Sequence, residues 1–101
     1  MIKIIAEVVK SKADINGNRY YFATITDIIT GDSATGLLSG DESNVSQALR
    51  RNGYEWEEFK VIVSELPIRQ FDKITKKMPY MGCTDDEIMK FCYTEWNKKE
   101  N

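Results

Sequence analysis

The alternation of apolar and polar positions in the first part of the chain predicts three β-strands. Residues 2–10, 19–30 and 34–39 are rich in β-branched and aromatic side chains, and turn sequences separate them. Asn16-Gly17 joins the first two segments, and Gly31-Asp32 joins the next two. Asn-Gly favours a hairpin because both residues tolerate positive φ. The pattern therefore predicts an antiparallel meander of three strands.

Helical periodicity replaces this alternation after Gly40. Ser43 or Asp41 is suited to be the N-cap of a first helix, since short polar side chains satisfy the free amides of the first turn. Asn52-Gly53 ends this helix, because glycine suits the left-handed position that follows the last turn. Residues 58–64 alternate once more and predict a fourth strand.

Two further helices are predicted after that strand. The helix over 67–78 opens with a proline, which is favoured at the first helical position. Thr84 and Glu87 form a capping box that starts the last helix. The element order β-β-β-α-β-α-α predicts one α+β domain, an antiparallel sheet of three to four strands with helices packed mainly on one face. We place this domain at 1–98 and expect the tail, 99–101, to be frayed.

The composition removes several classes of chemistry. The chain has 101 residues, a net charge of −2 and no histidine. Without histidine, neither Ser-His-Asp nor Cys-His catalysis is available within one chain. A negative net charge also argues against a generic nucleic-acid binder, which is normally basic. We therefore expect a protein that is not an enzyme.

The cysteines and the apolar runs indicate the compartment. Along the predicted last helix, Cys83 and Cys92 are about 12–13 Å apart at a rise of ~1.5 Å per residue. A disulfide needs Cα atoms within about 7 Å, so we expect unbridged cysteines and a reducing environment. No apolar run approaches the ~20 residues of a membrane span, and no signal-peptide pattern opens the chain. These features predict a cytoplasmic protein without a membrane partner.

Two short segments resemble ligand sites but do not match them in detail. Residues 14–18 alternate oxygen donors as a calcium loop does, yet the glycine stands in the fourth position instead of the sixth. After Gly40 a helix N-terminus could hold a phosphate, but Asp41 and Glu42 occupy the place of the anion. We expect neither a metal nor a cofactor.

Two adjacent segments carry opposite charge. Residues 67–81 hold four cations against one anion, whereas residues 54–66 hold four glutamates against one lysine. On the helix over 67–78 the cations lie opposite the apolar stripe, and they are Arg69, Lys73, Lys76 and Lys77. They either contact phosphates or an acidic protein, or form a solvated helix face. The acidic segment either neutralises the basic one across the surface or indicates a basic protein partner.

A pair of aromatic residues stands in the connection before the fourth strand. Tyrosine and tryptophan anchor protein interfaces and stack on nucleic-acid bases. The alternative is that they cover the edge of the core. With their acidic neighbours they form our candidate protein-binding segment, which consists of Tyr54, Glu55, Trp56, Glu57 and Glu58.

These observations favour a non-enzymatic binding module that acts through a protein–protein interface, at an exposed sheet edge or face together with residues 54–58. Its build is similar to that of the small accessory proteins of bacteriophages and mobile elements, including inhibitors of host proteins, although no motif is shared. One alternative is nucleic-acid binding through 67–78, and another is a small-molecule or nucleotide sequestering protein. Self-association is a further alternative, because the first hairpin has apolar residues on both faces.

Overall fold

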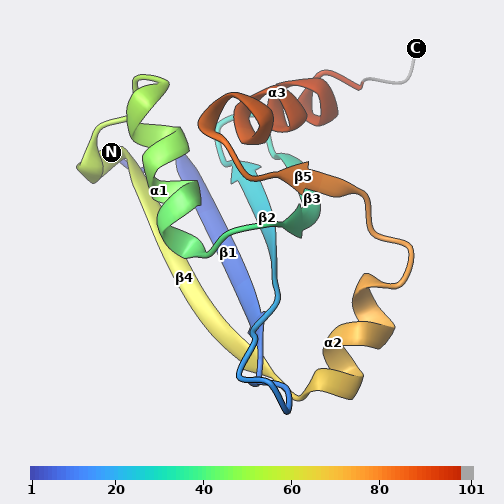
Figure 1. Ribbon diagram of the computed structural model, residues 1–101. Coiled ribbons are helices and arrows are strands. Elements are labelled where there is room, and N and C mark those ends of the chain that lie inside the picture. Colours follow the sequence, from blue (N-terminus) through green and yellow to red (C-terminus); the bar gives the residue numbers. More distant parts are fainter. Residues whose placement is uncertain (99–101) are drawn as a thin grey trace.

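The computed structural model describes residues 1–98, so the predicted frayed tail at 99–101 lies outside the described residues. Within the described part, the chain forms five strands, three α-helices and one short 3₁₀ helix, η1 (Figure 1). In chain order they are β1 (Ile4–Ser11), β2 (Tyr21–Asp27), β3 (Asp32–Leu38), α1 (Glu42–Arg51), η1 (Trp56–Glu58), β4 (Phe59–Leu66), α2 (Ile68–Thr75), β5 (Tyr80–Gly82) and α3 (Asp85–Trp96).

The strands form one mixed sheet in the order β4-β1-β2-β3-β5. The antiparallel meander of β1, β2 and β3 is confirmed. The prediction of a purely antiparallel sheet of three to four strands is wrong, because β4 pairs parallel with β1 and β5 pairs parallel with β3. The α+β class itself is confirmed. Both parallel pairings join segments that are distant in sequence, and local patterning does not reveal such pairs.

The main core lies between one face of the sheet and the helices α1 and α3, which share that side in Figure 1. Even-numbered residues of β1 and odd-numbered residues of β2 point into it, since paired residues share a face. The helices contribute their apolar stripes, which are Val45, Ala48 and Leu49 from α1 and Ile88, Met89, Cys92 and Trp96 from α3. The Trp96 indole N–H donates to the carbonyl of Ile25 at 3.0 Å inside this core.

Helix α2 packs on the opposite face, beside the hairpin end of the sheet (Figure 1). Phe71 of α2 contacts Phe22, with the ring centroids 5.5 Å apart, and Phe22 points away from the face of its neighbour Ala23. Crossovers between parallel strands are right-handed. The crossover through α1 runs from β3 to the β4 edge, and that through α2 runs back to β5, so the two helices take opposite faces.

Several boundaries differ from those predicted. The second helix ends at Thr75, with Lys76 as C-cap, because the residues that follow turn into β5, a strand the pattern did not reveal. Pro67 is its N-cap instead of its first helical residue. Asp41, and not Ser43, caps α1. The predicted capping box of Thr84 and Glu87 is confirmed at the start of α3.

The first hairpin turn also differs in detail. Gly17 has a φ of 82°, but among residues 1–98 no residue other than glycine has a positive φ. Asn16 therefore does not contribute the left-handed conformation expected of an Asn-Gly turn. Instead, the carboxylate of Asp14 accepts hydrogen bonds from the amides of Asn16 and Asn18, at 2.8 and 2.9 Å. These bonds lower the pKa of Asp14 from its ordinary value, the bond from Asn18 most of all.

Candidate functional site

β4 is the edge strand on one side of the sheet, and within residues 1–98 only β1 pairs with it. The carbonyls of Glu58 and Leu66 accept hydrogen bonds from the amides of Lys3 and Lys12, at 2.6 and 2.9 Å. In a regular strand the backbone groups of successive residues point to opposite sides. Even-numbered residues of β4 therefore face β1. The outward N–H and C=O groups are those of Phe59, Val61, Val63 and Glu65.

The other edge of the sheet is protected in ways that β4 is not. β5 has only three residues, and its pairing with β3 shifts register between Leu37 and Leu38. Pro79 precedes it directly. Short strands, irregular pairing and proline are common devices against edge-to-edge association. β4 has eight residues, no proline and a regular register over its whole length. Its free edge is therefore a template for one more strand.

Apolar side chains are exposed on both faces of this edge. Ile62 is 44% exposed on the face that α2 shares, and Val63 is 40% exposed on the core face. The C-terminal half of β4 extends beyond α1 in Figure 1, which explains why Val63 is left uncovered. A strand added along β4 would cover both side chains as well as the backbone groups between them.

Trp56 stands at the N-terminal end of β4, and its side chain is 63% exposed. The Phe59 ring lies 5.5 Å from it, and the Arg50 guanidinium lies over the indole at 5.4 Å. Arg50 is itself held by Glu55 at 3.0 Å and by the carbonyl of Tyr54 at 3.2 Å. These contacts orient the indole without burying it, and its N–H donates to no other residue among 1–98. An oriented, exposed tryptophan suits an interface anchor.

The other members of the predicted binding segment have different environments. Tyr54 is half-buried against the core, and burial together with nearby Tyr93 raises its pKa. Glu58 pairs with Lys3 at 2.6 Å, and the Glu55 amide together with this lysine lowers the pKa of Glu58. Glu57 is exposed and has no ion-pair partner within the described chain. The structure thus brings Trp56 and Glu57 to the surface beside β4.

The predicted basic stripe lies at the other end of β4. All four of its side chains, those of Arg69, Lys73, Lys76 and Lys77, are exposed, and none forms an ion pair with another residue in the 1–98 range. The acidic turn at 55–58 precedes β4 and the basic helix follows it, and an eight-residue strand spans about 26 Å. The length of β4 therefore separates the glutamates at 55–58 from the basic helix, whereas Glu65 lies at the end of β4 next to that helix and pairs with Arg19.

On β2 and β3, the part of the second sheet face that α2 leaves uncovered is polar. The hydroxyls of Thr24 and Thr35 bond each other at 2.9 Å, and those of Thr26 and Ser33 at 2.8 Å. These groups satisfy one another across β2 and β3. The apolar residues nearer the hairpin are covered by α2. This face therefore has fewer groups free to bind a partner than the β4 edge has.

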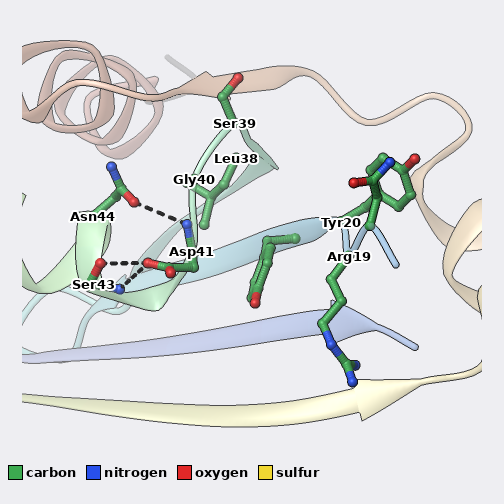
Figure 2. Close-up of a pocket in the computed structure, with 10 residues that line it drawn as sticks. Arg19, Tyr20, Leu38, Ser39, Gly40, Asp41, Ser43 and Asn44 are labelled. Carbon is green, nitrogen blue, oxygen red and sulfur yellow. Dashed lines mark hydrogen bonds between the residues drawn. The ribbon is translucent and has the colours of Figure 1, made fainter. Parts of the chain in front are cut away.

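The pocket in Figure 2 lies between the first hairpin, the end of β3 and the start of α1, with a volume of about 610 Å³. Several of its polar groups already bond one another. The Asp41 carboxylate accepts from the amide of Ser43 at 2.9 Å, and the Asp41 amide donates to Asn44 at 3.0 Å. The Ser43 hydroxyl, which bonds Asp41, contributes most to lowering the pKa of that carboxyl. Arg19 points away from Asp41 in Figure 2 and pairs with Glu65 at 2.6 Å.

No known family model, curated protein or solved structure matches this chain. No helix of the described part is long and apolar enough to cross a membrane. Residues 1–98 contain no cluster of three or more His, Cys, Asp or Glu that could hold a metal ion. Both cysteines are free, and burial raises the pKa of the Cys92 thiol to about 12.

The sequence pointed to residues 54–58, and the alternation over 58–64 predicted the strand behind them. It did not show which strand lies at the edge, because this position follows only from the parallel pairing with β1. Val61, Ile62 and Val63 are consecutive apolar residues, a pattern that is also typical of a buried strand. The single signal available was the pair of charged residues, Lys60 and Glu65, which flank this run.

Proposed function

We propose that this chain is a non-enzymatic protein-binding module that takes up an extended segment of a protein partner along the free edge of β4. One observation carries the proposal: β4 is a regular eight-residue edge strand that presents outward backbone groups and exposed apolar side chains. Strand addition gains affinity from main-chain hydrogen bonds and specificity from alternate side chains.

Trp56 adds an anchor at one end of this edge. Hot spots at interfaces are enriched in tryptophan, and a held side chain loses little rotamer freedom on binding. The exposed Glu57 beside it favours a partner with a cation near the end of its strand. A protein that blocks a host target in this way would be one instance of such a module.

Site-specific photocrosslinking in the cells that express the protein tests the proposal. A photoreactive phenylalanine analogue at position 62 lies on the β4 edge, and the same analogue at position 90 lies on the exposed side of α3 as the matched control. We expect a discrete adduct from position 62 and none from position 90.

Two further substitutions, made in the position-62 protein, separate the backbone from the side chain. Val63→Pro removes an outward N–H, which is tolerated at an edge because that N–H does not pair within the sheet. Val63→Ala keeps the N–H and shortens the side chain. Val63→Pro should reduce the adduct about tenfold and more than Val63→Ala does. Equal adducts at both positions, or indifference to Val63→Pro, would remove the support for the proposal.

A second candidate function rests on the four exposed cations at α2, which form no ion pair within residues 1–98 and suit contacts with phosphates. It predicts a gel shift with single-stranded or duplex nucleic acid whose affinity falls steeply with salt. The double substitution Lys73→Glu and Lys76→Glu should abolish the shift. If no shift appears at about 50 mM salt, where phosphate contacts are strongest, this candidate is eliminated.

A further inference from the structure

We infer that the segment taken up by β4 is β4 of a second copy of this chain, paired antiparallel about a two-fold axis. The inference rests on the proposed function and names the partner at the same edge. It joins the two sheets into one continuous sheet across both copies. Symmetric pairing of one edge with itself is isologous, and it closes without exposing a further copy of that edge.

The register of this pairing follows from the outward groups. In an antiparallel pair, residues that point outward must lie opposite residues that point outward. With the axis at Ile62, that residue lies opposite itself and Val61 lies opposite Val63, so the whole apolar run is matched. Moving the axis to Val61 or to Val63 sets Ile62 against Lys60 or against Ser64.

This register also satisfies the free backbone of the edge. The outward N–H and C=O groups pair Val61 with Val63 and Phe59 with Glu65 of the second copy, in both directions. Ile62 points its backbone toward β1, so the two isoleucines form a non-hydrogen-bonded pair. In such pairs the Cα atoms approach to about 4.5 Å, which brings the side chains into contact.

Charge complementarity selects the antiparallel direction. The acidic turn precedes β4 and the basic helix follows it, so antiparallel pairing brings Glu57 of one copy near Arg69 and Lys73 of the other, at both ends. Parallel pairing would set like charges side by side. These three side chains are exposed and have no ion-pair partner within residues 1–98, so they are available to the second copy.

Sedimentation equilibrium of the purified full-length chain is the first test. A single chain has a mass of 11.7 kDa, and we expect twice that mass at concentrations approaching 1 mM, with dissociation on dilution toward about 1 µM. Val63→Pro should weaken the dimer about tenfold and more than Val63→Ala does. A wild-type chain that remains at 11.7 kDa throughout this range overturns the inference.

Charge exchange tests the direction of pairing and does not depend on the proline variant folding. Glu57→Lys alone, and Arg69→Glu with Lys73→Glu, should each weaken self-association about tenfold. When the two variants are mixed, each end joins opposite charges again, and a one-to-one dimer should return. No interaction inside one chain can produce this rescue, because β4 separates the two segments. A dimer that is indifferent to all these changes overturns the inference.

The two proposals fail separately. If the purified chain is monomeric but position 62 yields an adduct with a different protein, the second-copy assignment is wrong and strand addition at β4 stands. If the purified chain is a dimer but Val63→Pro leaves it unchanged and position 62 gives no adduct, strand addition at β4 is wrong. If position 62 gives an adduct of twice 11.7 kDa and Val63→Pro reduces its yield, both proposals are supported.

Discussion

The two tryptophans have opposite roles that depend on where the fold places them. Trp96 lies on the buried stripe of α3, and its N–H satisfies the carbonyl of Ile25 in the core. Trp56 stands in the short 3₁₀ helix η1, with its ring exposed and with no acceptor for its N–H among residues 1–98. The helical period of α3 sets Trp96 on the same face as Ile88, Met89 and Cys92. For Trp56 the sequence left core and interface both open, because a connection has no periodicity to assign a face.

Substitution of each tryptophan by phenylalanine should separate these roles. Trp96→Phe leaves the buried carbonyl of Ile25 without its donor and should lower the free energy of unfolding by about 2 kcal/mol. Trp56→Phe, the matched control, should change it by less than about 0.5 kcal/mol, as for most surface positions. Urea titration followed by circular dichroism measures both. Equal losses would contradict the assignment of Trp96 to the core and Trp56 to the surface.

At the scale of elements, the predictable features are those set by neighbours in sequence. The box of Thr84 and Glu87 starts α3 as its spacing indicates. The Glu87 carboxylate accepts hydrogen bonds from the backbone amides of Thr84 and Cys83, each at 3.1 Å. These bonds lower the pKa of Glu87 below its ordinary value of 4.5. Because the folded pKa is depressed, the stabilisation is present above pH 4.5 and is lost as the pH falls through the folded pKa.

Glu87→Gln should therefore show a smaller loss of stability on acidification than the wild type. The difference between the two should be largest above pH 4.5 and should vanish in stronger acid, where Glu87 is protonated in both states. Urea titrations across the acid range measure it. A Glu87→Gln curve that runs parallel to that of the wild type would contradict the role of the cap.

β5 marks the limit of prediction at this scale. It follows Pro79, has three residues and pairs with β3, which lies distant in sequence, so neither alternation nor turn chemistry announces it. Gly36 on β3 makes room for it. A Cβ at Gly36 would lie 2.9 Å from the Cβ of Met81 and 3.1 Å from the ring of Phe91. The sequence alone gives no reason for a glycine at position 36, because the reason is the pairing of β3 with the distant β5.

Gly36→Ala should push β5 and α3 away from β3. The φ of Gly36 lies outside the left-handed region, so the effect is one of packing and not of backbone strain. Because overpacking a tight core contact commonly costs about 1–3 kcal/mol, we expect a loss in that range in urea titration. Ser33→Ala, on the exposed side of the same strand, is the control; it removes only the solvent-exposed bond to Thr26 and should cost less than Gly36→Ala does. A neutral Gly36→Ala would contradict the close packing of β5.

At the scale of the molecule, topology decides which edge is free. The meander and the two crossovers place a long, regular β4 on one side and a short, irregular β5 on the other. The same topology sets the acidic turn at 55–58 and the basic helix α2 at opposite ends of β4. The sequence pattern located the charges, the aromatic residues and most elements. It could not locate the free edge, because edge position depends on which strands pair across the whole chain.

Amide hydrogen exchange along β4, in the free chain and in its complex with a second copy or a crosslinked partner, tests the central claim most directly. In the free chain, the outward amides of Val61 and Val63 should exchange quickly while the inward amide of Ile62 is protected. Partner binding should protect the outward amides as well. If both outward amides still exchange quickly in the complex while protection appears on α2 or around the pocket, binding through the β4 edge is contradicted.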